Sequence, residues 1–264
     1  MAIRRKILNL DPNLINMRAG NVPGWNAGVF AGRRDSIPAA GSTWYTLSDG
    51  PADIAFPAAP VTVAVASTSV LDTAAGMGAR AVAIQGLDEN YELVQEVIVL
   101  AGQTAVNSVN TYIRVNTAQV VHTGSLGWNQ GEINIGDSAD TWVAGAPTVT
   151  GPFQVVQADE NMSLSGVYTV PANQELYLST AIVTPGYLSS MDAGLEARTW
   201  DNGFDYLPWY RLIRAEVSFG SSVELSVSGL APLPPRTDLR LRIRRAPNTA
   251  VNTFIAVNFA LKQV

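Results

Sequence analysis

Short runs of alternating apolar and polar residues dominate the chain from Val61 onward. In VTVAVAST, Val61, Val63 and Val65 alternate with Thr62 and Ala64. Successive residues of a β-strand point to opposite faces, so this alternation predicts strands. The runs ARAVAIQG, LVQEVIVL, TYIRVN, AQVVHT and INIG follow, separated by Gly, Asn, Asp and Ser. A spacing of about ten residues between such runs is typical of an antiparallel sandwich or barrel.

The second half of the chain repeats this style. Its runs are GVYTVPANQELYLSTAIV, EVSFG, VELSVSG, LRLRIRR and TFIAVNFALKQV. Pro171 and Ala172 interrupt the first run and predict a turn. The stretch 144–163 holds two prolines and two glycines and predicts a domain boundary. We therefore expect an all-β fold with two antiparallel β-sandwich or jelly-roll-like domains, at 51–150 and 151–264.

Residues 1–50 are different, because they are rich in Gly, Pro, Asn and Ala and have no sustained period. Such a segment cannot build its own core. Its aromatic residues, among them Trp25, Phe30 and Trp44, still need a surface to cover. We expect an extended N-terminal arm that lies on the chain's own domains or on a neighbouring subunit.

Composition excludes several classes of site. The chain has no cysteine among its 264 residues, so disulfides, thiolate metal sites and cysteine nucleophiles are excluded. Its net charge of −5 offers no general attraction for nucleic acid. The N-terminal MAIRRKILNLDPN has no unbroken apolar run, so we expect no signal peptide. No stretch approaches the length of apolar sequence that a membrane span requires.

The segment GMGARA, Gly76 to Ala81, fits the letters of the G-x-G-x-x-G/A dinucleotide fingerprint. That fingerprint requires a helix after the glycines, with its N-terminus facing the pyrophosphate. Here Val82 and Ile84 alternate with alanines and predict a strand instead. We expect a glycine-containing loop between two strands of a long hairpin, with Gly76 and Gly78 supplying positive φ or a bulge. Valine at either position should then disturb folding without any loss of nucleotide affinity.

His122 is the only histidine of the chain, so an ordinary zinc site cannot form around it. The sequence has no G-x-S-x-G elbow that would present a catalytic serine to this histidine. We expect no catalytic residue, no cofactor-binding residue and no metal ligand. His122 is then a structural or surface residue near the end of a strand.

The stretch RTWDNGFDYLPWYRLI, residues 198–213, concentrates aromatic and acidic side chains. Aromatic faces beside carboxylates can bind sugars, and the pair Asp201 and Asp205 is of the kind that hydrolyses them. DNGFD also offers oxygen ligands for calcium but lacks the rest of an EF-hand loop. The interpretation that we favour is a core or a subunit interface, where Trp, Tyr and Arg are enriched.

In LRLRIRR, alternation places Arg240, Arg242 and Arg244 on one face of a strand and Leu241 and Ile243 on the other. Arginines on a sheet face usually pair with acids or cover a neighbouring subunit, although a nucleic-acid groove is an alternative. The residues predicted to make interface or ligand contacts are Trp25, Phe30, Trp200, Tyr206, Trp209, Tyr210, Arg240, Arg242 and Arg244.

Much of the chain, roughly residues 40–264, resembles a module of virion structural proteins from tailed bacteriophages, especially marine and cyanobacterial ones. The matching elements are Ser67–Thr68–Ser69, Asp72 to Ala75, Gly78–Ala79–Arg80, Gly86–Leu87–Asp88, Thr104–Ala105–Val106, Arg114–Val115–Asn116 and Gly124 to Gly131. YTVPANQELYL and PPRTDLRLRIRR resemble segments of the same proteins. The sequence departs from the pattern at Asn173, where the pattern has glycine, and at Ala101–Gly102, which replaces an Asn-Gly turn.

The resemblance implies a non-enzymatic virion structural protein that is assembled in the host cytoplasm. It implies a homo-oligomer, with a trimer as the expected state, and contacts with other virion proteins. A tail, baseplate or fibre position is favoured, with capsid decoration (cement) or a head fibre as the alternative. A carbohydrate- or receptor-binding module is a further alternative. No membrane contact, nucleic-acid contact or cofactor is expected.

Overall fold

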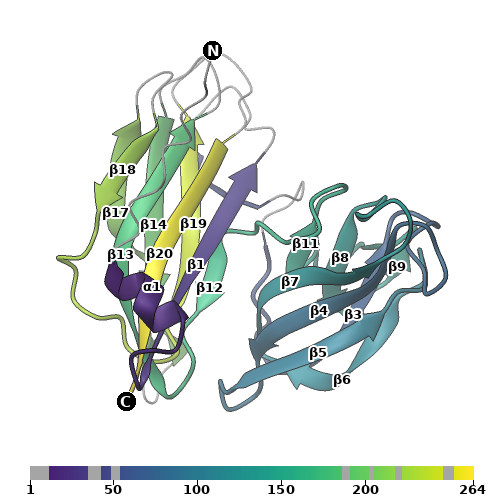
Figure 1. Cartoon of the computed structure of the whole chain (residues 1–264), viewed down its shortest axis with the longest axis horizontal. Coiled ribbons are helices and arrows are strands. Elements are labelled where there is room, and N and C mark those ends of the chain that lie inside the picture. The colour runs from purple at the N-terminus through teal and green to yellow at the C-terminus, as the bar shows by residue number, and fades with distance from the viewer. Residues whose placement is uncertain are drawn as a thin grey trace.

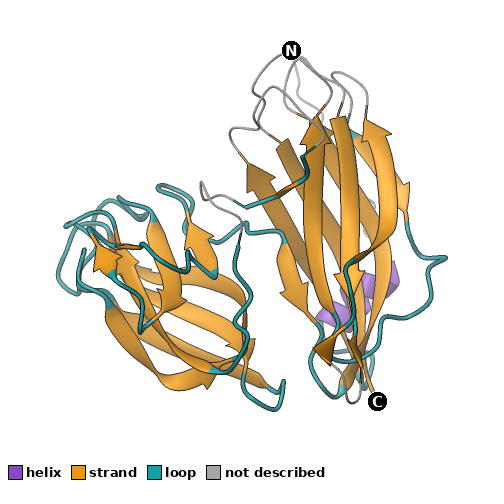
Figure 2. Ribbon diagram, turned by 180° about the vertical axis from the view of Figure 1, so that it is seen from behind, coloured by secondary structure: helices purple, strands orange, loops and turns teal. Residues whose placement is uncertain are grey.

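The computed structural model describes residues 12–34, 43–48, 54–185, 191–201, 205–217, 222–245 and 253–264. Two β domains, one larger than the other, lie side by side in it (Figure 1). Strands dominate both domains, and helix α1 (Pro12–Arg18) is a short element packed beside β1 and β20 (Figure 2). The expected all-β fold is therefore confirmed.

The larger domain is a sandwich of two antiparallel sheets. One sheet has the order β1-β20-β13-β18, and the other has the order β12-β19-β14-β17. Strand β2 (Tyr45–Thr46) adds to β19 on the side that β12 also uses. The other strands are β1 (Trp25–Arg34), β12 (Val167–Thr169), β13 (Gln174–Pro185), β14 (Met191–Arg198), β17 (Tyr210–Val217), β18 (Val223–Ser226), β19 (Asp238–Arg245) and β20 (Thr253–Gln263).

These eight main strands are interleaved between the sheets. Numbered one to eight along the chain, they give the sheet orders 1-8-3-6 and 2-7-4-5. All but one of the steps from strand to strand therefore cross from one sheet to the other. This is the order of a jelly roll, an eight-stranded double sheet built from two Greek keys. The jelly-roll-like fold expected for the second domain is confirmed.

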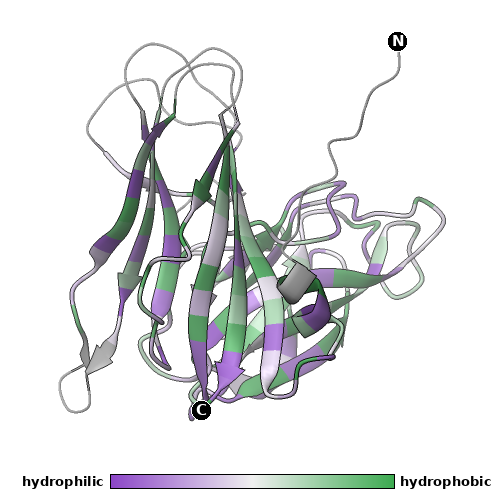
Figure 3. Ribbon diagram, turned by 60° about the vertical axis from the view of Figure 1, so that its left-hand side comes forward, coloured by the Kyte–Doolittle hydropathy of each residue, from purple (hydrophilic) through white to green (hydrophobic). Residues whose placement is uncertain are grey.

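The alternation seen in the sequence builds the core of the larger domain. Ala193, Leu195 and Ala197 of β14 are buried against the facing sheet, as are Leu241 and Ile243 of β19. Figure 3 shows hydrophobic and hydrophilic residues alternating in bands along the strands of the molecule. Each large side chain buried in this way contributes about 1.5–3 kcal/mol. The polar partners of these residues are left on the outer face of the sheet.

The smaller domain, residues 54–163, is inserted between the first and second strands of the jelly roll. It is also a sandwich, with sheets β11-β8-β3-β6 and β5-β4-β7 around a separate core. Its strands are β3 (Val61–Ser67), β4 (Ala79–Leu87), β5 (Leu93–Val99), β6 (Val106–Tyr112), β7 (Arg114–Thr123), β8 (Ile133–Asp137) and β11 (Gln154–Val156). Two short hairpins complete the described fold, β9 (Trp142–Val143) with β10 (Ala146–Pro147), and β15 (Trp200–Asp201) with β16 (Asp205–Tyr206).

The N-terminal region differs from the expected extended arm. Residues 25–34 form β1, which pairs with β20 along its whole length. Phe30 lies in the core, and Trp25 packs on Tyr177 with ring centroids 5.1 Å apart. The glycines and alanines of this segment obscured a strand whose Phe30 is buried in the core of its own domain. Residues 1–11 and 35–42 lie outside the described part of the chain.

The domain boundary also lies later than residue 150. Strand β11 pairs with β8, and the amide of Ser163 donates to the carbonyl of Ala118 in β7, 2.9 Å away. Gly151 and Pro152 therefore mark a loop within the smaller domain. The second domain begins only after residue 163, and it also includes β1 and β2 from the expected arm.

The loop that contains GMGARA folds around the buried carboxylate of Asp72. This carboxylate accepts hydrogen bonds from the Ser67 hydroxyl (2.6 Å) and from the amides of Ala79 (2.7 Å), Gln130 (2.9 Å) and Gly131 (3.0 Å). One side chain thus joins the end of β3, the start of β4 and the segment before β8. A strand follows the glycines, as predicted, and no helix faces them.

The predicted hairpin between these two strands is wrong. Strand β3 pairs with β6 and β8, whereas β4 pairs with β5 and β7, so the loop carries the chain from one sheet to the other. The glycines are required by close packing rather than by positive φ. A Cβ on Gly78 would lie 2.1 Å from an oxygen of Asp72, and a Cβ on Gly76 would lie 2.0 Å from the Leu71 carbonyl oxygen.

We predict that Gly78→Ala lowers the free energy of unfolding by about 2–3 kcal/mol, because the new methyl group displaces the Asp72 carboxylate. Gly229→Ala is the matched control, since a Cβ there meets nothing within 4 Å. Thermal and urea unfolding measure both variants. Equal stability of the two variants would contradict the role given to Asp72.

Candidate interaction surface

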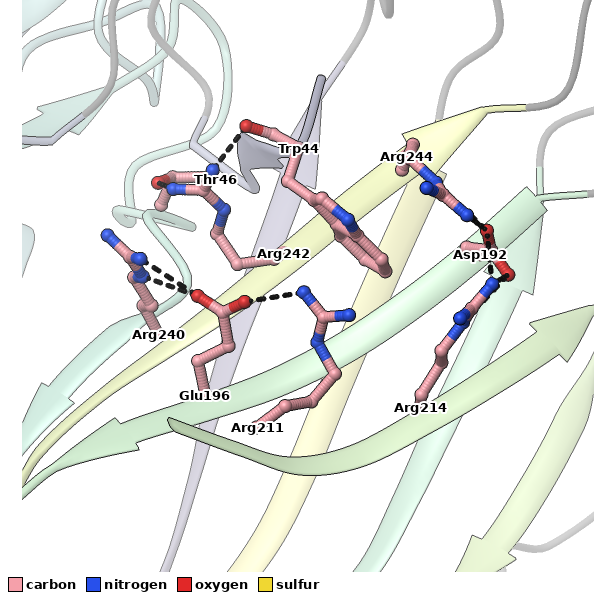
Figure 4. Close-up of polar contacts among 9 residues, drawn as sticks. All are labelled: Trp44, Thr46, Asp192, Glu196, Arg211, Arg214, Arg240, Arg242 and Arg244. Atoms are coloured by element: carbon pink, nitrogen blue, oxygen red, sulfur yellow. Dashed lines mark hydrogen bonds and ion pairs between the residues drawn. The ribbon is translucent and has the colours of Figure 1, made fainter. Parts of the chain in front are cut away.

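The outer face of the β12-β19-β14-β17 sheet carries a concentration of arginines. The alternation predicted for β19 is confirmed, because Leu241 and Ile243 are buried in the core while Arg240, Arg242 and Arg244 point away from it (Figure 4). These arginines come into register with the acidic residues of β14. Asp192 lies opposite Arg244, and Glu196 opposite Arg240.

Each of the two β14 carboxylates is held between two arginines. Asp192 accepts from Arg244 at 2.6 Å and from Arg214 of β17 at 3.2 Å. Glu196 accepts from Arg240 and from Arg211 of β17, both at 2.8 Å. Figure 4 shows both triads on neighbouring parts of one sheet face. The spacing of four residues between the carboxylates puts both on the same side of β14.

Two tryptophans fill the spaces between these charged groups. Trp44, just before β2, has the guanidinium carbons of Arg211 and Arg244 at 3.9 and 5.3 Å from its ring centroid. Trp209 has those of Arg240 and Arg198 at 3.9 and 4.7 Å. Cation–π contacts of this kind contribute about 0.5–2 kcal/mol each. Arg242 adds hydrogen bonds from its guanidinium to the Trp44 carbonyl and to the Thr46 hydroxyl.

Gly194 explains how Trp44 can lie on the sheet. It occupies the outer-face position of β14 between the two carboxylates, and a Cβ there would be 3.2 Å from the Trp44 ring. The indole therefore covers the bare backbone at this point. A larger side chain would lift it away from both arginines.

The same pattern continues into the contact between the two domains. Asp238, which is fully buried, accepts from Arg114 of β7 through both oxygens, at 2.8 and 2.9 Å. It also accepts from Arg198 at 2.8 Å and from the Thr169 hydroxyl at 2.6 Å. Arg114 donates in addition to the Pro57 carbonyl, 2.8 Å away. These bonds join the smaller domain to strands β12, β14 and β19 of the jelly roll.

We call this continuous set of contacts the arginine ladder. In spatial order it consists of Arg214, Asp192, Arg244, Trp44, Arg211, Glu196, Arg240, Trp209, Arg198, Asp238 and Arg114. Arginines outnumber carboxylates in it, so the ladder keeps an excess of positive charge. Each planar guanidinium group can bind two oxygens of a carboxylate or phosphate at once.

The ladder sets the ionisation of its carboxylates. Burial raises the pKa of Glu196, but the hydrogen bonds from Arg211 and Arg240 outweigh burial, so this pKa lies below its ordinary value. The pKa of Asp192 is lowered in the same way, with Arg244 and Arg214 outweighing burial. Burial and the charge of Arg242 lower the pKa of Arg240, which stays charged at any ordinary pH.

The other predicted contact residues are dispersed. Trp25 and Phe30 lie on β1, where Phe30 also lines a cleft of about 330 Å³ between the two domains. Tyr210, at the start of β17, is exposed. The side chains of Trp200 and Tyr206 lie outside the described part of the chain, although their backbones pair in the β15–β16 hairpin. The side chains of Asp201 and Asp205 also lie outside it.

The site prediction therefore identified only part of the ladder. Trp209 and the arginines of β19 were found, whereas the two β14 acids and the β17 arginines were missed. A usable signal was present in MDAGLEAR, in which acids and apolar residues alternate as in LRLRIRR. Arg114 and Asp238 give no local signal, because they are 124 residues apart and meet only in the folded chain.

Among the described residues, no group of three or more His, Asp or Glu side chains is placed to hold a metal ion. The described residues also include no helix long and apolar enough to cross a membrane. His122 is exposed on β7.

Comparisons with known proteins assign no family to this chain. No protein-family model matches the chain, and no curated protein matches it. A solved structure of infectious bursal disease virus, Gt strain, matches 96% of this chain and 83% of its own at 11% identity and a TM-score of 0.26. The Gx strain matches 91% and 76% at 11% identity and a TM-score of 0.23. Similarity this low carries no argument, so the jelly-roll assignment stands on the strand pairing alone.

We predict that Glu196→Gln makes stability less dependent on pH in the acid range. The Glu196 pKa is lowered in the folded chain, so its contribution is complete above the ordinary pKa of 4.5 and is lost as pH falls through the folded value. The variant should lose about 1–3 kcal/mol at pH 7 and show a shallower decline below about pH 4.5. Urea unfolding at a series of pH values measures this difference. Parallel curves for the two proteins would exclude this coupling.

We also predict that Arg114→Met destabilises the chain by about 3–5 kcal/mol, because it leaves the Asp238 carboxylate buried with one cation fewer. Arg214→Met is the control at the opposite end of the ladder. Its side chain is 53% exposed, so the loss there should stay below about 1 kcal/mol. Chemical unfolding followed by tryptophan fluorescence compares the two variants, and similar losses would refute the ranking.

Proposed function

We propose that this chain is a non-enzymatic structural protein of a bacteriophage virion that works by assembly with itself and with other virion proteins. The observation that carries the proposal is the jelly-roll strand order of the larger domain, a topology recurrent in viral coat proteins. The same topology also occurs in lectins and cupins, because one fold can host different functions. The sequence resemblance to phage virion modules is the second support.

Several of the residues that carry this resemblance have structural roles. Asp72, Gly78 and Gly131 build the hydrogen-bonded loop that joins the two sheets of the smaller domain. Arg114 forms the ion pair that joins the two domains. A module defined by such residues is specified for its shape, which supports a role in assembly rather than in catalysis.

The arginine ladder is suited to such a role. Its ion pairs and ring contacts fix the outer face of one jelly-roll sheet, so little order has to be gained when a neighbouring protein binds. The exposed guanidinium group of Arg214 is the part of the ladder most available to that neighbour. We place the protein in the tail, baseplate or fibre region of the particle, with capsid decoration as the alternative.

The carbohydrate-binding alternative has less support. The ring of Trp209 is already in contact with Arg198, Arg240 and Phe56, so it does not present an open face to a sugar. Tyr210 is exposed but stands apart from these contacts. A glycan array with the purified chain tests this alternative. Specific binding that is lost in Tyr210→Ala would support it.

Gold-labelled antibodies against the purified chain, applied to intact virions under the electron microscope, test the proposal. Labelling at the tail or baseplate is the expected result, and labelling over the head would place the protein in the decoration class instead. Antibodies against a known coat protein of the same particle serve as the labelling control. Virions that contain no copy of the chain, by labelling and by mass spectrometry, would refute the proposal.

A further inference from the structure

The smaller domain is strongly acidic. Residues 54–163, all of them described, contain ten acidic and two basic residues, a net charge of −8 in a chain whose total is −5. The acids are Asp72, Asp88, Glu89, Glu92, Glu96, Glu132, Asp137, Asp140, Asp159 and Glu160, and the bases are Arg80 and Arg114. Two copies of this domain repel each other over most of their surfaces.

One face of this acidic domain carries no acidic residue, lysine or arginine. The outward positions of the β5-β4-β7 sheet are Ala81, Ala83, Gln85, Leu93, Gln95, Val97, Val99, Thr117, Gln119, Val121 and His122, which lies opposite Ala81. Among these, Gln85, Leu93 and Thr117 line the cleft between this domain and the jelly roll. Their inward neighbours, among them Val82, Ile84, Ile98 and Val120, fill the core of the domain. The other eight outward residues form a sheet face of apolar and neutral polar side chains with one histidine.

Large apolar side chains on this face are open to solvent. Val97, Val99 and Val121 are 56, 54 and 46% exposed. Val97 pairs across β4 with an alanine, so the small residues of the central strand lie between the larger ones of β5 and β7. Contiguous exposed apolar surface of this kind marks contact sites between proteins.

We infer that this face, which we call the neutral face, packs against the neutral face of a second copy of the chain around a symmetry axis. A symmetry axis brings identical residues of the copies together, so any charged side chain beside it meets its own like charge. An acidic domain can therefore approach its own copy only where it is uncharged. The neutral face has no acidic residue, lysine or arginine, and burial of its valines supplies the attraction. The partner in this contact is a second copy of the chain. The inference rests on the proposed assembly role.

The charge distribution also defines the competing contact. An acidic domain could bind the arginine ladder of the next copy, head to tail. Salt separates the two arrangements, because screening weakens attraction between opposite charges and relieves repulsion between like ones. Association through the neutral face should be unchanged or stronger between ~0.05 and ~0.5 M NaCl. Dissociation of the oligomer by salt would identify the head-to-tail contact and overturn the inference.

The absence of cysteine from the chain permits a direct test. Val97→Cys introduces a single thiol on the neutral face, and Val143→Cys introduces one on β9, where the exposed fraction of 58% is nearly the same. A short bismaleimide should link Val97→Cys chains to one another at micromolar concentration and leave Val143→Cys chains unlinked. Equal linking of the two variants, or none in either, would overturn the inference.

Val97→Glu tests the energetics in the full-length protein. It should weaken self-association by about 100-fold in light scattering, because the contact would bury like charges, while Val143→Glu leaves the mass unchanged. Val97→Thr, which keeps a β-branched side chain, controls for folding and should weaken association less. A Val97→Glu protein that folds and keeps the wild-type mass, or a wild-type monomer, would overturn the inference. These results are independent of virion labelling, so failure of this contact and failure of the virion role are distinguishable.

Discussion

The buried carboxylate of Asp238 is the point on which the arrangement of the two domains depends. It accepts hydrogen bonds from Arg114, Arg198 and Thr169, and these residues come from the inserted domain and from two other strands of the jelly roll. A carboxylate in a fully buried position is costly unless its oxygens are satisfied, and here both are. The same bonds that neutralise Asp238 therefore fix the smaller domain against the larger one.

The arginine ladder continues this pairing of carboxylates with arginines across the outer sheet face. Each carboxylate lies between two guanidinium groups, and each tryptophan fills the space between two of them. These contacts hold the side chains of a mainly charged surface in place, although each exposed pair contributes little by itself. The positive charge is concentrated on the jelly roll, while the inserted domain is acidic. The two domains therefore offer different chemistry to a neighbouring molecule.

Several features could be predicted from local sequence because they depend on local geometry. Alternation in LRLRIRR placed Arg240 and its companions on the outside of a strand, since adjacent residues of a strand always face opposite ways. The strand after GMGARA was predicted from Val82 and Ile84 for the same reason. The pairing of these strands could not be predicted in the same way, because β3 and β4 are neighbours in the chain but belong to different sheets. Alternation predicts which side chains of a strand face inward, but it does not predict which strand pairs with it.

The sequence by itself determined the all-β class, the inward and outward faces of its strands and the strand, in place of a helix, that follows the glycines of GMGARA. Each of these follows from contacts between residues close together in the chain. Only the tertiary structure decided that residues 25–34 complete a jelly roll, that Asp238 meets Arg114, and that GMGARA folds around Asp72. These outcomes depend on pairs far apart in sequence, whose meeting is set by the packing of whole sheets. The neutral face of the acidic domain belongs to this second class, since three separate strands must align before it exists.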